Sequence, residues 1–394
     1  MNNSQTSAKK CWRIFLWAFP SRIHPLRVIP AKRTPIRRVQ ESAAEPGSRR
    51  CRRFLRPCVA MTAAMATFSL PVIPLIPGTA SAAQQGSLLT DAGTVDDTDY
   101  IQQLLNNPQN GVVDLPYRPS SAPFIIRPGL TIPRGEVING HGTTLKVKDN
   151  YGDYRAILTA PATTDLSGLK ITGIVFDQNA SGNPISTSNC SSSCLSSTSP
   201  RFVLALLSGT GITITQDMFI NTNNTNTVVT GSSTRDVTLS YSTFSTVNTP
   251  WHDHSSVYTS GTNTVIYGNT FNGNASLAAA IEVHGDKANI QNNTINDYYR
   301  GTNIVASNTT FSNNTVYRAA NVIDLWSTVA PGLHDVTIAQ NRIQLDLAHW
   351  AQVMKSLGRA MPERQYTQFV IYDAVSTYPF TRISIQNNTS IPLQ

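Results

Sequence analysis

Charged residues are scarce in this chain of 394 residues, because Lys, Arg, Asp and Glu make up only 14% of it, against about 25% in an ordinary soluble protein. Cysteine is also rare, with five residues, which excludes a small disulfide-stapled scaffold. The 23 glycines and 23 prolines are too few for collagen or a low-complexity chain. Asn, Thr and Ser take the place of the missing charges, and they favour turns and hydrogen-bonded ladders over helix surfaces.

Basic charge is missing from most of the chain, although the formal net charge is +8. The first 82 residues hold 14 of the basic and 2 of the acidic residues, so the remainder has 17 basic and 21 acidic residues and a net charge of −4. A protein that binds nucleic acid needs a basic patch on its folded part. The sequence therefore predicts no nucleic-acid partner.

Residues 1–82 have the pattern of an N-terminal extension that ends in an export signal. Four arginines at positions 49–53 precede an uncharged apolar stretch at 59–77, and the small residues of 80–82 follow as a cleavage site. The pattern is typical of secreted proteins, and the arginine pairs leave both the Sec and the twin-arginine routes open. Prolines interrupt the end of the apolar stretch, which disfavours a membrane anchor. We expect a secreted protein without stable membrane insertion.

Two cysteines follow this leader, Cys190 and Cys194. In an exported protein such a pair most often forms a disulfide. A metal site would require two further ligands nearby, and the neighbouring sequence offers none. We therefore expect a Cys190–Cys194 disulfide in a surface loop and no metal site.

A repeat dominates the rest of the sequence, with the pattern apolar-x-apolar-x-x-polar-x-apolar. Its second apolar position falls at Ile171, Ile214, Leu239, Ile266, Ile290, Phe311, Ile338 and Ile385. The middle steps of 21 to 27 residues match one turn of a solenoid. The longer first and last steps indicate loop insertions near 178–201 and 344–369.

The alternation in each unit predicts a short strand with one buried face. Such strands bury that face by stacking on the next copy, about 4.8 Å away. The polar position then becomes a column of stacked amides, since Asn tolerates a left-handed turn and its amides hydrogen-bond along a column. Its members are Asn269, Asn293, Asn314, Asn341 and Asn388. We predict a parallel β-helix over residues 111–394. An antiparallel sandwich is the alternative fold, and it would require two-residue hairpin loops between its strands.

The opening of the folded part carries a family resemblance. Residues 96–105, which begin Asp96-Asp97-Thr98, form a short amphipathic helix, and apolar segments and a Gly140-His141-Gly142 turn follow. This series resembles the pectate-lyase-like superfamily of carbohydrate-active proteins. The resemblance implies an all-β, right-handed, single-stranded parallel β-helix whose N-terminal cap covers residues 83–110. It leaves the reaction open, because that superfamily contains lyases, glycosidases, epimerases and phage tailspikes.

A second strand in each coil supplies the candidate catalytic groups. Alternation predicts that Tyr258, Glu282 and Asn303 share one outward row, which Asp324 joins after a loop. Two carboxylates can act as a general acid and base, and Glu282 and Asp324 lie about 9–10 Å apart at one coil spacing per row. That distance favours an inverting glycosidase, whereas a nearer Asp253 would suit a retaining one. The catalytic candidates are Glu282, Asp324, Asp253, His254 and His284.

Aromatic, amide and basic side chains around this row are candidates for sugar binding. They are Trp251, His252, Tyr258, Tyr298, Tyr299, Arg300, Asn303 and Trp326. We expect a hydrolase that cleaves a polysaccharide or oligosaccharide without a cofactor. A polysaccharide lyase or uronan epimerase, with Arg300 on a uronate carboxylate, and a non-catalytic glycan-binding solenoid remain alternatives. The sequence also leaves a homo-oligomer open.

Overall fold

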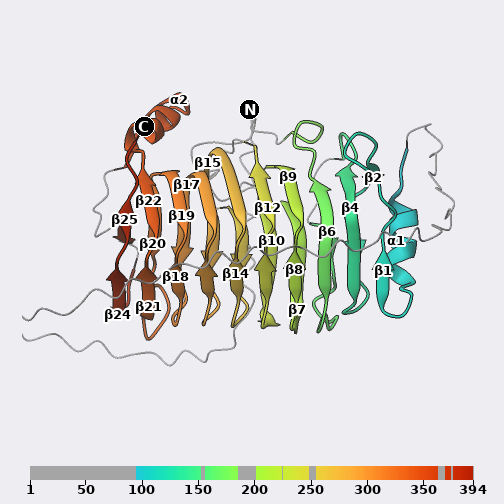
Figure 1. Ribbon diagram of the computed structural model, residues 1–394, viewed down its shortest axis with the longest axis horizontal. Coiled ribbons are helices and arrows are strands. Elements are labelled where there is room, and N and C mark those ends of the chain that lie inside the picture. Colours follow the sequence, from blue (N-terminus) through green and yellow to red (C-terminus); the bar gives the residue numbers. More distant parts are fainter. Residues whose placement is uncertain are drawn as a thin grey trace, which may run out of the picture. The chain divides into compact units, whose positions relative to one another are not determined.

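The computed structural model describes residues 95–151, 156–184, 201–223, 225–247, 254–362, 369–373 and 376–393. The expected export signal, the Cys190–Cys194 pair and three candidate site residues, Trp251, His252 and Asp253, lie outside these ranges. The described part is a solenoid in which each coil stacks on the one before (Figure 1).

The strands form three rows along the solenoid, and strands within a row pair in parallel. The first row contains β1 (Val112–Asp114), the starts of β4 (Val137–Val147) and β6 (Lys170–Asp177), β8 (Thr213–Thr215), β11 (Thr238–Ser240), β14 (Val265–Tyr267), β16 (Asn289–Gln291), β18 (Thr310–Ser312), β21 (Leu333–Ala339) and β24 (Phe380–Gln386). The second row contains β2 (Phe124–Ile126), the ends of β4 and β6, β9 (Met218–Thr222), β12 (Thr243–Thr246), the starts of β15 (Thr270–Val283) and β17 (Thr294–Ile304), β19 (Thr315–Ala319), β22 (Arg342–Leu345) and β25 (Thr389–Ser390). The third row contains β3 (Leu130–Thr131), β5 (Ala156–Thr159), β7 (Arg201–Thr210), β10 (Thr225–Arg235), β13 (Ser255–Thr259), the ends of β15 and β17, β20 (Asn321–Leu325) and β23 (Val370–Tyr372).

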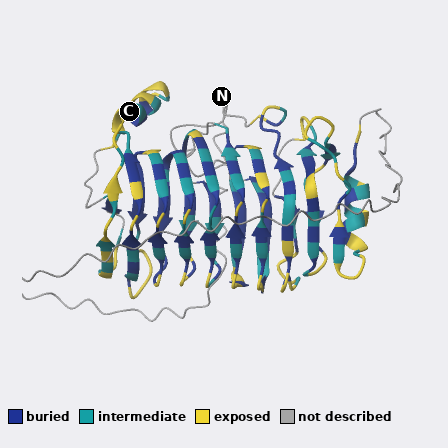
Figure 2. Cartoon of the chain, viewed as in Figure 1, coloured by how far each residue is buried: buried dark blue, intermediate teal, exposed yellow. Residues whose placement is uncertain are grey.

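The register confirms the repeat. The eight apolar positions identified in the sequence are paired in one continuous column, from Ile171 with Ile214 to Ile338 with Ile385. In the second row, Phe176, Phe219, Phe244 and Phe271 stack with ring centroids 4.7 to 5.4 Å apart. Burial of these columns forms the core, and exposed residues gather at the turns and the ends (Figure 2).

The predicted amide column is present between the first and second rows. The Asn293 amide donates to Asn314 Oδ1 and to the Ile266 carbonyl, and the same two bonds recur for Asn269, Asn314 and Asn341 on their own neighbours. We expected the asparagines of the column to have the left-handed backbone conformation themselves, and this expectation is wrong. It falls on the preceding residue, for example Asn292 and Asn313, each with φ 56°, because the turn bends one position before the amide enters the core.

Toward the N-terminus, the column position that follows Asn269 is occupied by Ser242, and one coil further by Asp217. Its Oδ1 accepts from the Ile174 backbone N–H at 2.8 Å, while its Oδ2 has no hydrogen-bond partner among the described residues. Burial raises the pKa of Asp217 to about 7. A carboxyl group whose pKa is higher in the folded than in the unfolded state lowers the free energy of unfolding as pH rises from about 4 to about 7.

We expect Asp217→Asn to stabilise the protein at pH 8 and to have little effect at pH 4. The asparagine amide would stay neutral and would meet the Ile171 carbonyl, the counterpart of the Leu239 carbonyl that Asn269 uses. The gain at pH 8 is up to about 4 kcal/mol, since each pKa unit corresponds to about 1.4 kcal/mol. Thermal unfolding at the two pH values measures it, and a difference that does not depend on pH would contradict it.

Two helices flank the coils in the described ranges. Helix α1 (Thr98–Asn106) covers the first coil with Ile101 and Leu105, as the sequence predicts for a cap. Asp97 ties the helix to this coil, because its Oδ2 accepts from the Ile125 backbone N–H at 2.9 Å. No helix in the described ranges is long and apolar enough to cross a membrane.

Helix α2 (Leu347–Ser356) lies in the insertion predicted near 344–369. Its buried face consists of Trp350 and Met354, which pack on Leu277, Tyr299 and Ala320 at the bend between the second and third rows. The helix therefore covers the outside of several coils near the C-terminal end of the solenoid (Figure 1).

Candidate functional site

Four of the candidate site residues form one row on the outer side of the third row of strands. Tyr258 pairs with Glu282, Glu282 with Asn303, and Asn303 with Asp324. The predicted alignment is confirmed, including Asp324 beyond its intervening loop. Glu282 and Asp324 are two coils apart, so their backbones are separated by about 9–10 Å at the usual strand spacing.

Glu282 is the more accessible of the two carboxylates. Its side chain is 12% exposed, and its Oε1 lies 2.7 Å from Nε2 of His284. The His284 ring in turn stacks on Tyr258, with centroids 4.7 Å apart and an interplanar angle of 29°. The three side chains support one another and fix the orientation of the Glu282 carboxylate.

His254 lies beside this group but is buried, with 3% of its surface exposed. Burial lowers the pKa of His254 to about 4, and the charge of Glu282 opposes this shift only in part. The imidazole is therefore neutral at physiological pH. Neither ring nitrogen has a hydrogen-bond partner among the described residues, so His254 can accept or donate one proton toward a group that enters beside Glu282.

Asp324 has a different environment from Glu282. The sequence predicts an exposed side chain, but Asp324 is fully buried, which corrects that expectation. Its Oδ2 lies 3.6 Å from Nε of Arg300 and accepts from the Asn321 amide at 3.3 Å. Alternation placed Asp324 on the correct side of the strand, but neighbouring side chains cover it there. Arg300 is likewise held in an ion pair within the protein.

The structure contradicts the assignment of Tyr298 and Tyr299 to sugar binding. Both are buried, with 0% and 1% of their surface exposed, because residues 297–300 continue strand β17 and do not form a loop. The Tyr298 hydroxyl lies 2.6 Å from Oγ of Ser256 inside the coil. Tyr299 packs edge-on against Trp350 of helix α2, with centroids 5.4 Å apart. Both rings are core residues.

Trp326 and Asn303 complete the surroundings of the row. Trp326 is half-buried and follows strand β20 at the position equivalent to His284, since the backbone of His284 bonds to Thr259 and that of Trp326 bonds to Ile304. The Trp326 indole N–H and Asn303 Oδ1 have no hydrogen-bond partner in the described ranges. Buried polar groups are normally paired, so these atoms, with the His254 nitrogens, mark a place that can receive a polar ligand.

A metal ion has no obvious place among these groups. In the part of the chain that the structure describes, no three His, Cys, Asp or Glu side chains are grouped as metal ligands would be.

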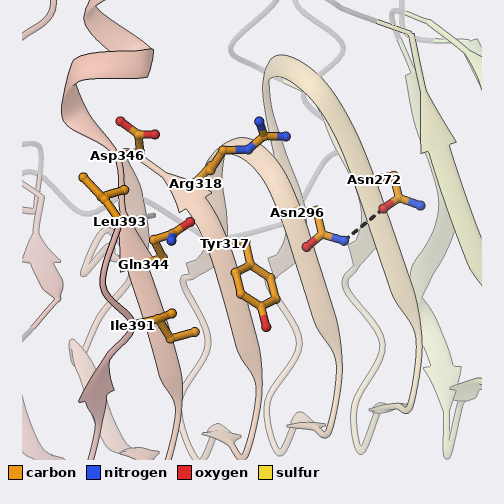
Figure 3. A pocket seen from close by; sticks show the side chains of 8 residues that line it. All are labelled: Asn272, Asn296, Tyr317, Arg318, Gln344, Asp346, Ile391 and Leu393. Atoms are coloured by element: carbon orange, nitrogen blue, oxygen red, sulfur yellow. Dashed lines mark hydrogen bonds between the residues drawn. The ribbon is translucent and has the colours of Figure 1, made fainter.

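A second group of residues was not identified from the sequence. An open hollow lies over the second row of strands, beside helix α2, and Asn272, Asn296, Tyr317 and Gln344 contribute to its lining (Figure 3). The sequence does hold a signal for them. Each one directly follows the last apolar residue of its repeat unit, so the four share one outward position.

We compared the chain with protein families, curated proteins and solved structures, and only the solved structures gave matches. No protein-family model and no curated protein matches the chain. The structure is similar to a mutant tailspike protein of E. coli bacteriophage HK620 in complex with a pentasaccharide, with a TM-score of 0.56, 16% identity and 77% of this chain covered. The match spans 56% of the tailspike chain. An endo-xylogalacturonan hydrolase from Aspergillus tubingensis matches with a TM-score of 0.46 and 14% identity, over 75% of this chain and 90% of that chain.

The tailspike likeness concerns the fold alone, and it agrees with the parallel register, the strand-dominated chain and the N-terminal cap. The chain therefore has a right-handed parallel β-helix fold.

Proposed function

We propose that this chain is a carbohydrate-active enzyme that hydrolyses glycosidic bonds, with its reaction centre at Glu282 and Asp324. The observation that carries the proposal is the register, which places Tyr258, Glu282, Asn303 and Asp324 side by side on successive coils. Tyr258 and Glu282, the partly exposed members of this row, can contact a sugar chain laid across the coils. The similar tailspike, which was solved with a pentasaccharide, supports the same substrate class.

The two carboxylates have environments that suit different roles. Glu282 is partly exposed and bonded to His284, whereas Asp324 is buried beside Arg300. In glycosidases, two carboxyl groups take the separate roles of general acid and general base because their environments differ. We assign the protonation of the leaving oxygen to Glu282 and the activation of water to Asp324. The backbones of the two residues are about 9–10 Å apart, a spacing that leaves room between the carboxyl groups for that water, as inversion requires.

The remaining candidates support the substrate. The Trp326 ring and the Tyr258 ring can contact the apolar faces of sugars, and Asn303 can accept from a sugar hydroxyl. Trp251, His252 and Asp253 directly precede His254 in the sequence, so we also propose that they border the site. Export through the leader, with a Cys190–Cys194 disulfide in the secreted chain, completes the proposal.

A polysaccharide lyase or uronan epimerase has less support. Either enzyme requires a cation to bind the substrate carboxylate, and Arg300, the candidate for this task, is paired with Asp324. The net charge of −4 beyond the leader also disfavours a polyanionic substrate. His254 would still serve as a neutral base for elimination, so the products must decide between the two reactions.

Digestion of a glycan panel with mass-spectrometric detection tests the proposal. We expect fragments whose masses include one added water per cleaved bond. Unsaturated fragments that lack this water and absorb near 235 nm would show a lyase. If no glycan in the panel were cleaved while one of them bound, the chain would be a glycan-binding solenoid, and the hydrolase proposal would fail.

A further inference from the structure

The hollow over the second row of strands has the composition of a binding site. Its volume is about 590 Å³, and it is open to solvent. The side chains of Asn272, Asn296, Tyr317 and Gln344 project into it from successive coils (Figure 3). The row therefore presents one hydrogen-bonding or aromatic group about every 4.8 Å. None of these residues belongs to the row of Glu282.

The amides of this row are held in place, and those of Asn272 and Asn296 keep free hydrogen-bonding capacity. Gln344 is largely buried and its Nε2 donates to the Pro392 carbonyl at 2.9 Å, so it offers its Oε1. Asn296 Nδ2 donates to Asn272 Oδ1 at 3.0 Å. This bond uses one donor of Asn296 and one acceptor of Asn272, so each amide retains capacity for another partner. Tyr317 stands between Asn296 and Gln344, and its ring is partly exposed. An aromatic face flanked by amides offers contact to the C–H face of a sugar ring and hydrogen bonds to its hydroxyls.

The charges at the edge of the hollow already have partners in the protein. Nη2 of Arg318 lies 3.3 Å from Oδ2 of Asp297. Asp346 Oδ1 accepts from the His349 backbone N–H at 2.9 Å and so caps helix α2. With both charges engaged, an ionic ligand gains little here. A neutral ligand that is rich in hydroxyl groups fits the lining better.

We propose that this hollow is a second carbohydrate-binding site, which holds a neutral oligosaccharide segment with its chain running across the coils. One sugar unit advances by a distance close to one coil spacing, about 4.8 Å, so successive units meet Asn272, Asn296, Tyr317 and Gln344 in turn. This site is separate from the proposed reaction centre, since the two rows of side chains lie on different rows of strands.

Affinity electrophoresis in gels that contain a dissolved polysaccharide tests this site. The gels hold galactomannan, xyloglucan, arabinoxylan or starch as neutral polymers and polygalacturonate or alginate as acidic ones. All proteins carry Glu282→Gln, so that cleavage does not interfere. We expect at least one neutral polymer to slow the parent protein, Tyr317→Ala to weaken that binding about tenfold or more, and Tyr317→Phe to retain it.

Tyr241→Ala is the matched control, because Tyr241 is a tyrosine of another face that is 60% exposed. It should bind as the parent does. Equal binding by Tyr317→Ala and the parent, binding to acidic polymers alone, or no binding to any neutral polymer would each overturn the proposal. The outcome is separate from that of the proposed hydrolysis, which is measured as fragment release by the chain with Glu282 intact.

Discussion

Glu282→Gln is expected to lower glycan hydrolysis by about 10³-fold without changing the fold. The substitution keeps the shape of the side chain and its bond to His284, but an amide cannot deliver a proton to a leaving oxygen. General acid catalysis by one positioned group contributes about 10²–10⁴-fold. The rate of reducing-end release from a substrate found in the panel measures the effect, and circular dichroism and thermal unfolding check the fold.

The matched control for this variant is Asp99→Asn. Asp99 lies on helix α1, far along the chain from the row, and its side chain is 78% exposed. It should retain the full rate. A Glu282→Gln protein that hydrolyses within a few-fold of the unmodified chain would remove Glu282 from the reaction centre and leave the stacked row as a binding surface.

Asn314→Asp is expected to destabilise the protein strongly at pH 8. The Asn314 amide is fully buried and donates to the Ile290 carbonyl at 3.0 Å and to Asn341 Oδ1 at 3.2 Å. An aspartate would place an ionised acceptor against both acceptors inside the core. An uncompensated charge buried in this way costs about 3–5 kcal/mol. The variant should unfold at a much lower temperature at pH 8 and recover part of the loss at pH 4, where the carboxyl group is protonated.

Asn313→Asp provides the control for the same chemical change one residue away. Asn313 is exposed and has a left-handed backbone, which Asp also tolerates. Its melting temperature should stay close to that of the unmodified chain at both pH values. If the two variants were equally stable, the amide column would not be a stabilising element of the fold.

The sequence predicted the fold because each coil repeats one local rule. The spacing of the apolar residues identified the columns from Ile171 to Ile385, and the register is the one that this spacing requires. Column formation depends only on which residue meets its counterpart in the next coil. The chain supplies that information directly in its repeat.

The accessibility of the site could not be predicted by the same rule. Alternation tells which side of a strand a residue takes, and it placed Glu282, Asn303 and Asp324 together. It does not tell what covers that side, so the burial of Asp324 against Arg300 appears only in three dimensions. The assignment of Tyr298 and Tyr299 to sugar binding was wrong for a related reason, because strand β17 continues through both residues and their rings are buried.

The hollow at Tyr317 was missed because no polar residue there is unusual in isolation. Outward Asn and Gln residues on a solenoid are ordinarily solvated, and the sequence does not show that Asp346, Ile391 and Leu393 form walls beside them. The insertion itself was predicted from the long last step of the repeat. Its position over Leu277, Tyr299 and Ala320 depends on packing between segments far apart in the chain.

Proton NMR of the first products from a cleaved glycan tests the central claim most directly. If the coils hold Glu282 and Asp324 two steps apart on one wall and these two groups perform the reaction, the new reducing end appears with the opposite anomeric configuration before it mutarotates. Net retention of configuration would mean that the two acids at this spacing are not the reacting pair.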